Sequence, residues 1–213
     1  MSKQNFETLK VVLIGESGVG KTSIISQFID KVFENDPQST IGGTFSTKKI
    51  QCGNGKLLNL EIWDTAGQER YRSVTKMFYK DANAALLIYD ITNKISFEEI
   101  QKYWIVQVKE SAPENIILAI VGNKLDLFEN EKVDENEGRQ FAQEIGALFY
   151  LTSPKKGMGI KDLFYEIGNK ILNPKDGNNK INNENNEDIN NISRKGTHKL
   201  NEERNKKKKN CCR

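Results

Sequence analysis

Two kinds of apolar spacing alternate along residues 9–172. Short, nearly continuous apolar runs are typical of buried strands, and apolar residues that recur every three or four positions are typical of helices. The first kind predicts strands at 9–14, 44–51, 57–63, 84–89, 116–122 and 148–152. The second kind predicts helices at 21–31, 73–79, 97–110, 136–146 and 160–172.

The order of these elements predicts the fold class. Asn54-Gly55, between the second and third strands, is a strong signal for a tight hairpin turn. Elsewhere strands and helices alternate, which favours parallel pairing, and the runs 84–89 and 116–122 are apolar enough to be buried on both faces. We therefore expect a three-layer α/β fold, with a six-stranded, mostly parallel sheet and helices on both faces.

The pattern ends after Leu172. Residues 173–213 contain 12 asparagines but only one leucine, three isoleucines and no aromatic residue. Such a segment cannot bury enough apolar surface to offset the entropy lost on ordering. The sequence thus predicts one folded domain, 1–172, followed by a disordered Asn/Lys-rich tail, 173–213.

Charge follows the same division. The chain has a net charge of +3, but residues 173–213 carry +5 and the remainder −2, so the basic bias does not indicate a nucleic-acid-binding surface on the body. The three cysteines, Cys52, Cys211 and Cys212, cannot form a disulfide framework, which fits a reducing compartment. We expect no membrane span, because no apolar run approaches about 18 residues.

Residues 15–22 read GESGVGKT and lie between the first strand and the first helix, the context of a phosphate-binding loop. Their glycines let successive backbone N–H groups point inward and cradle phosphate oxygens together with the helix N-terminus. Lys21 adds a positive charge, and the Thr22 hydroxyl suits Mg²⁺. The expected nucleotide-binding residues here are Gly15, Ser17, Gly18, Val19, Gly20, Lys21, Thr22 and Ser23.

A second motif, DTAGQER at residues 64–70, directly follows the third strand. Ligands of such sheets bind at the carboxyl ends of strands, where Asp64 can hold Mg²⁺, most simply through a water. Gly67 would let a backbone N–H approach a terminal phosphate. Gln68 can both donate and accept a hydrogen bond, which suits a residue that orients an attacking water, so we expect Gln68 to be the catalytic residue.

A third motif, NKLD at residues 123–126, follows the fifth strand. The Asp126 carboxylate can accept two hydrogen bonds from a purine with an N1–H and a 2-amino group, which describes guanine and excludes adenine. Asn123 and Lys124 would complete this nucleotide-binding segment. The polar loop 36–45 contains threonines, one of which could complete the Mg²⁺ shell only while a third phosphate is bound.

Taken in order, the phosphate loop, STIG at 39–42, WDTAGQER at 63–70, NKLD and the double cysteine near the end resemble the Rab family of small GTPases. The resemblance covers about residues 8–172 and the last residues. It implies a GTP-binding domain that switches between GTP and GDP forms. It also implies that Thr40 is a Mg²⁺ ligand beside Thr22 and Asp64, and that Phe33 lies against the guanine. Ile41, Phe45, Trp63 and Phe78 would face effectors, although core packing explains the last three equally well.

The resemblance also implies partners. No arginine in the motifs is placed to neutralise the transition state, so hydrolysis should be slow without a GTPase-activating protein. A nucleotide exchange factor, a GDP-dissociation inhibitor or escort protein, and effectors would complete the cycle of a monomer. Geranylgeranyl groups on Cys211 and Cys212, with the lysines at 206–209, would hold the protein on the cytoplasmic face of intracellular membranes, with a cytosolic pool. The segments 42–45 and 89–93 and Tyr71 resemble the early-endosomal branch.

One segment departs from the family pattern. Where the family usually has E-T-S-A-K, residues 151–155 read LTSPK. The family's alanine offers its backbone N–H to guanine, and Pro154 has no N–H to offer. Ser153, Pro154 and Lys155 are still expected at the guanine, with that hydrogen bond lost or moved to Lys155.

Two other functional interpretations of the sequence stay open. A binding module could hold GTP with little hydrolysis, as a switch or scaffold, and Pro154 lends this slight support. A phosphate-loop kinase would need a lid insertion, and no such insertion is evident. Asp126 also argues against a kinase, because its carboxylate suits guanine. A nucleic-acid-binding role has only the lysine run behind it, without the interleaved aromatic residues that stack on bases.

Overall fold

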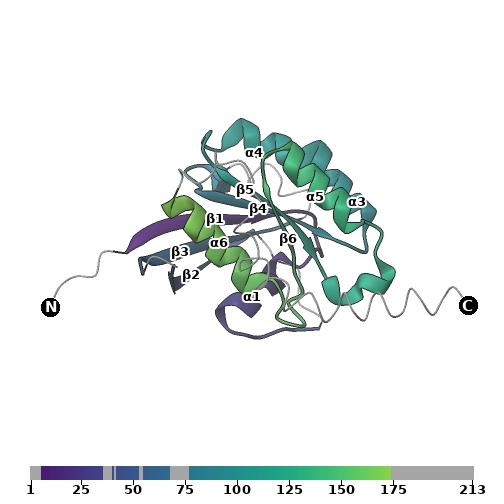
Figure 1. Ribbon diagram of the computed structural model, residues 1–213, viewed down its shortest axis with the longest axis horizontal. Coiled ribbons are helices and arrows are strands. Elements are labelled where there is room, and N and C mark those ends of the chain that lie inside the picture. The colour runs from purple at the N-terminus through teal and green to yellow at the C-terminus, as the bar shows by residue number, and fades with distance from the viewer. Residues whose placement is uncertain (1–5, 36–39, 41, 53–54, 68–76, 174–213) are drawn as a thin grey trace, which may run out of the picture. The chain divides into compact units, whose positions relative to one another are not determined.

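A six-stranded sheet forms the centre of the computed structural model, which describes residues 6–35, 40, 42–52, 55–67 and 77–173 (Figure 1). The strand order is β2-β3-β1-β4-β5-β6. Only β2 runs antiparallel to its neighbour, and all other pairs are parallel. The strands are β1 (Glu7–Ile14), β2 (Gly43–Gln51), β3 (Leu57–Thr65), β4 (Ala84–Asp90), β5 (Ile117–Asn123) and β6 (Leu148–Leu151). The predicted α/β class and six-stranded sheet are confirmed.

Helices cover both faces of this sheet (Figure 1). They are α1 (Lys21–Ile29), α3 (Lys94–Glu99), the π-helix η2 (Ile100–Trp104), α4 (Ile105–Ser111), the 3₁₀-helix η3 (Leu125–Asn130), α5 (Glu135–Glu144) and α6 (Ile160–Leu172). On one face α1 and α6 pack together, with Phe28 stacked on Phe164 at a centroid distance of 4.0 Å. On the other face α3, α4 and α5 lie over β4, β5 and β6, where Phe97 contacts Tyr89 and Phe141.

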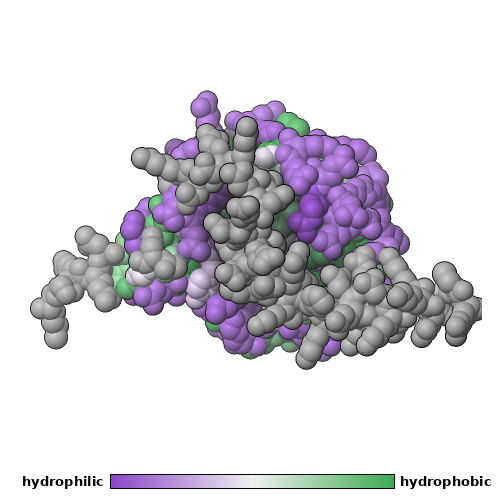
Figure 2. All heavy atoms as spheres, viewed as in Figure 1, coloured by the Kyte–Doolittle hydropathy of each residue, from purple (hydrophilic) through white to green (hydrophobic). Residues whose placement is uncertain are grey.

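The burial of each strand follows from its place in the sheet. Every residue of the central strand β4 is buried, as its continuous apolar run predicted. β2 lies at the edge and is mostly exposed. On the face shown in Figure 2, the described residues that can be seen are mostly hydrophilic, with scattered apolar residues among them.

Several boundaries differ from the sequence expectation for identifiable reasons. The helix expected at 97–110 begins at Lys94, because the Asn93 side chain accepts a hydrogen bond from the Ile95 backbone N–H and caps the helix. It contains a π-helical segment that the spacing did not predict. The first helix ends at Ile29 rather than at 31, where Lys31 has a left-handed φ of 62°.

Parts of the prediction lie outside the described residues. Of the helix expected at 73–79, residues 77–79 are described and helical. The catalytic candidate Gln68, the effector candidate Ile41 and the tail 174–213 with both terminal cysteines are not described. Within the described part of the chain, no helix is long and apolar enough to cross a membrane.

Candidate functional site

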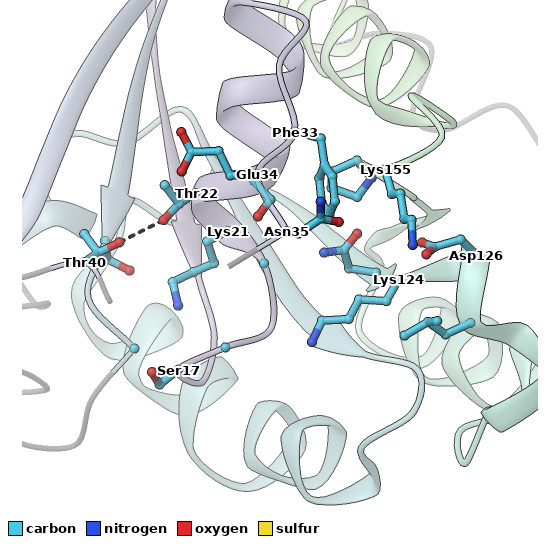
Figure 3. Close-up of a pocket in the computed structure, with 18 residues that line it drawn as sticks. Ser17, Lys21, Thr22, Phe33, Glu34, Asn35, Thr40, Lys124, Asp126 and Lys155 are labelled. Carbon is cyan, nitrogen blue, oxygen red and sulfur yellow. Dashed lines mark hydrogen bonds between the residues drawn. The ribbon is translucent and has the colours of Figure 1, made fainter. Parts of the chain in front are cut away.

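A cavity of about 450 Å³ opens at the carboxyl-terminal edge of the sheet. Figure 3 shows its two ends, with Ser17, Lys21, Thr22 and Thr40 at one and Phe33, Lys124, Asp126 and Lys155 at the other. Its size is that of a typical small-molecule site. The lining residues are Ser17, Gly18, Gly20, Lys21, Thr22, Ser23, Phe33, Glu34, Asn35, Thr40, Thr65, Gly67, Asn123, Lys124, Asp126, Leu127, Pro154 and Lys155.

The phosphate loop takes a backbone path that only glycine permits at two points. Gly15 has φ 145°, and a Cβ there would lie 2.2 Å from the Ile88 carbonyl oxygen. Gly20 has φ 95°, and its Cβ would lie 2.4 Å from Asn123 Nδ2. The loop therefore packs directly against β4 and the end of β5, and it leads into the N-terminus of α1.

Lys21 is 6% exposed, and its ammonium group lies inside the loop. Its Nζ donates to the carbonyl oxygens of Gly15 at 2.8 Å and Glu16 at 2.9 Å. Burial lowers the pKa of Lys21 to about 8, against the opposing effect of the Asp64 and Glu16 charges. A buried cation with only carbonyl partners is well placed to gain from an anionic ligand.

Three oxygen-bearing side chains meet beside the loop. Thr22 Oγ1 donates to Asp64 Oδ2 at 2.6 Å and lies 2.8 Å from Thr40 Oγ1 (Figure 3). Asp64 is 2% exposed, and its Oδ1 has no hydrogen-bond partner among the residues that the structure describes. Burial raises the pKa of this carboxyl. A hard cation such as Mg²⁺ prefers oxygen ligands, so two hydroxyls and a buried carboxylate with an orphaned oxygen fit it.

Gly67 lies against the phosphate loop. A Cβ on it would lie 2.4 Å from the Ser17 nitrogen and 2.4 Å from the Glu16 carbonyl carbon, so only glycine fits. The segment that begins with Asp64 thus touches the loop directly at Gly67, and the residues that follow, from Gln68, are not described.

The far end of the cavity is built by β5, η3 and the turn after β6. Ser153 Oγ donates to Asp126 Oδ1 at 2.6 Å and so orients the carboxylate. Lys124, which has a left-handed φ of 64°, pairs with Asp90 Oδ2 at 2.7 Å. Pro154 is buried and Lys155 exposed, and both line the cavity.

Asn123 joins three segments of the site. Its Nδ2 donates to the Val19 carbonyl oxygen at 2.8 Å, and its Oδ1 accepts from Thr152 Oγ1 at 2.9 Å. Asn123 is 1% exposed. Both amide atoms are used within the protein, so Asn123 ties the phosphate loop to the ends of β5 and β6.

The structure thus brings most of the predicted site residues around one cavity. Four predicted residues, Gly15, Val19, Asp64 and Ser153, support it from just outside its lining. The cavity is also lined by four residues that were not predicted, Glu34, Asn35, Thr65 and Leu127. Thr65 belongs to the motif DTAGQER and Leu127 directly follows NKLD, so their positions in the sequence could have indicated them. Nothing in the sequence singled out Glu34 or Asn35.

The predicted aromatic cluster also forms. Trp63 lies 5.1 Å from Phe45 and 5.5 Å from Phe78, measured between ring centroids. Phe45 is 50% exposed, so the cluster combines packing with a surface that a partner could reach.

Comparison with known proteins places this chain in a family. Residues 10–173 match the model of the Ras family. The chain is 44% identical to Ras-related protein Rab-31 of Rattus norvegicus over 76% of its own length and 83% of that protein. It is 42% identical to human Rab-22A, over 76% and 83% of the two chains, and 40% identical to Rab-21 of Canis lupus familiaris, over 78% and 73%. The resemblance inferred from the motifs is confirmed, and the chain belongs to the Ras family as a Rab-type small GTPase, a GTP hydrolase of vesicle traffic.

Proposed function

We propose that the protein binds GTP with Mg²⁺ in the cavity, where Thr22, Thr40 and, through a water, Asp64 would hold the Mg²⁺. The observation that carries this proposal is that the Thr22 and Thr40 hydroxyls meet at Oδ2 of the buried Asp64, whose Oδ1 has no hydrogen-bond partner among the described residues. Mg²⁺ would neutralise charge on the terminal phosphates. Lys21 would hold those phosphates from the opposite side, with the N–H groups of the loop.

Thr40 makes the site sensitive to the nucleotide state. It comes from the loop between α1 and β2, whereas Thr22 and Asp64 come from α1 and β3. Loss of the third phosphate would weaken the hold on Thr40 and on the segment after Gly67. Gln68 would orient the attacking water. The GTP and GDP forms would therefore differ at 36–45 and 64–79. These segments contain Phe45 and Phe78 and adjoin Trp63, where effectors would bind.

Guanine would occupy the other end of the cavity. Asp126, oriented by Ser153, would accept from the base, and Phe33 and Lys124 would flank it. Once a bound base excludes water from the Asp126 carboxylate, the absence of these donors would disfavour adenine by a few kcal/mol, on the order of what an unmet buried acceptor costs. Pro154 supplies no N–H to the base.

The remaining proposals concern the whole chain. The domain would end near residue 172, and the tail would carry lipids on Cys211 and Cys212 that hold the protein on the cytoplasmic face of an endosomal membrane, with a cytosolic pool. An activating protein, an exchange factor, a GDP-dissociation inhibitor or escort protein, and effectors would act on a monomer. The similarity to Rab-31, Rab-22A and Rab-21 supports an endomembrane role.

The test begins with the purified protein. Chromatography of the denatured extract should show a guanine nucleotide, with Mg²⁺ in a near-equal amount by elemental analysis. GTP and GDP should compete for the site and ATP should not. Slow phosphate release from GTP should accelerate with a cell extract that contains activating proteins. Indifference to guanosine nucleotides at micromolar concentration would contradict the proposal, and tight binding without accelerated release would favour a switch that does not hydrolyse GTP.

A further inference from the structure

Glu16 places a negative charge in the loop that is proposed to bind a polyanion. Unlike its neighbours Ser17 and Gly18, it does not belong to the lining of the cavity. Its Oε1 instead accepts a hydrogen bond of 3.0 Å from Nε1 of Trp104. The carboxylate is therefore turned away from the place where phosphates would lie.

The Glu16 backbone is held from two further directions. Its carbonyl oxygen accepts from Lys21 Nζ at 2.9 Å. The Gly67 Cα lies so close that a Cβ would meet the Glu16 carbonyl oxygen at 2.5 Å. Lys21 and Gly67 are both residues assigned above to the phosphate site, so the position of Glu16 bears directly on the shape of that site.

Trp104 is well suited to fix that position. It is fully buried and closes the π-helical segment η2, whose wider turn is completed by the bond from the Ile105 N–H to the Ile100 carbonyl. The Tyr103 ring packs edge-on against the indole at 5.0 Å. Single π-helical turns inside α-helices occur frequently at functional sites. The indole N–H is thus presented by a buried, closely packed part of the core.

We propose that Trp104 and Glu16 act as positioning residues for the phosphate loop. Their hydrogen bond ties the loop to the helix that runs through α3, η2 and α4, and it sets how long the nucleotide stays bound. This inference rests on the proposed function of the cavity.

Two substitutions isolate the hydrogen bond. Trp104→Phe keeps an aromatic ring in the core. It removes the N–H donor and the part of the indole that the smaller phenyl ring does not replace. Glu16→Gln keeps an acceptor oxygen and removes the charge. Phe97→Leu is the matched control, because Phe97 is fully buried in α3 of the same helix but packs on Tyr89 and Phe141 rather than on the loop.

The first measurement is the rate at which the full-length protein releases fluorescently labelled GDP in the presence of Mg²⁺. We expect Trp104→Phe to accelerate release about tenfold, the effect of losing one hydrogen bond to a charged group. Glu16→Gln should accelerate it less, since an acceptor remains. In the double variant the two effects should not multiply, because they remove the same bond.

The second measurement is hydrogen exchange of the phosphate-loop amides in the nucleotide-free protein. Trp104→Phe should speed exchange at residues 15–20 more than in α6, and Phe97→Leu should not. Unchanged GDP release and exchange in a folded Trp104→Phe variant would overturn the inference, as would equal effects of Phe97→Leu. If the unaltered protein holds no guanine nucleotide, the proposed function fails. The hydrogen-exchange measurement alone then decides whether the Trp104–Glu16 hydrogen bond holds the phosphate loop.

Discussion

Asp64, a proposed Mg²⁺ ligand, lies in an environment that is unfavourable for a charge. It is 2% exposed, and burial raises the pKa of its carboxyl even though Thr22, Lys21 and Thr40 act to lower it. The raised pKa means that the charged form is less favourable here than in water. Buried groups with a shifted pKa are typical of functional sites, where a ligand of opposite charge can stabilise the charged form.

Asp64→Asn should therefore separate stability from binding. Without nucleotide or metal, we expect the free energy of unfolding at pH 7 to rise, because a buried charge is removed. The Mg²⁺ concentration needed to retain GDP should rise about 10- to 100-fold. Urea unfolding and magnesium titrations of GDP release measure the two effects. Asp81→Asn, at an exposed position, is the control, and equal magnesium requirements in both variants would contradict the prediction.

Pro154 gives a second prediction at this scale. Pro154→Ala restores a backbone N–H at the guanine end of the cavity. We expect GDP release to slow, by about tenfold at most, which corresponds to one neutral hydrogen bond. Pro113→Ala, in the loop before β5, should leave release unchanged. An unchanged rate in Pro154→Ala would show that the base does not use this N–H.

A third prediction concerns the effect of the buried Tyr89 hydroxyl on stability. Its hydroxyl is buried and has no hydrogen-bond partner within the described part of the chain. Burial raises the pKa of Tyr89 above the ordinary value of 10.0, and acidic neighbours led by Glu137 add to the effect. The unfolded chain then loses the phenol proton at a lower pH than the folded protein does, so stability falls as pH rises above 10. Tyr89→Phe should add about 1 kcal/mol at pH 7 and reduce this alkaline loss.

Urea unfolding at pH 7 and above pH 10 tests the Tyr89 prediction. Tyr165→Phe, at a partly exposed position of α6, is the control. A Tyr89→Phe variant that is less stable at pH 7 would indicate that the hydroxyl has a partner, such as a buried water.

Motif residues could be identified from the sequence because their chemistry depends on type and spacing. Lys21, Thr22 and Asp126 are of this kind. The Glu16–Trp104 hydrogen bond could not, since it joins residues 88 positions apart, and neither Glu34 nor Asn35 has a spacing that marks it.

At the scale of elements, the start of α3 depends on one capping side chain. Asn93→Ala removes the acceptor of the Ile95 N–H, which lies 3.1 Å away. The unfolding free energy should fall by about 1 kcal/mol, with GDP release unchanged. Asn136→Ala, an exposed residue in the first turn of α5, removes an asparagine that is not at a cap position. Equal losses in urea unfolding would contradict the capping role.

Element positions were predictable where periodicity was clear. The runs of β1, β4 and α6 carry their own pattern. The π-helical turn of η2 and the 3₁₀-helix η3 were not predicted, because their backbone hydrogen bonds depend on what surrounds them. η3, for example, begins where the Leu125 N–H reaches the Thr152 carbonyl oxygen of another segment.

At the scale of the whole molecule, membrane attachment is proposed to reside in Cys211 and Cys212. In eukaryotic cells, the Cys211→Ser/Cys212→Ser variant of the full chain should move to the soluble fraction while binding GDP normally. Each single variant should be held only weakly, because one lipid chain anchors a protein marginally. Fractionation and mass spectrometry of both cysteines, with the buried Cys52 as an unmodified internal control, provide the test. Membrane retention of the double variant would contradict this proposal.

The alternation of strands and helices, the family, and the side chains suited to phosphate, magnesium and guanine could all be identified from the residues alone, because periodicity and motif spacing are local properties. Three features emerged only in three dimensions: an Asp64 oxygen without a partner among the described residues, the hydrogen bonds by which Asn123 joins two strand ends to the loop, and the Trp104–Glu16 hydrogen bond. Those features depend on which distant segments share a space, and that is set by the packing of helices on the sheet.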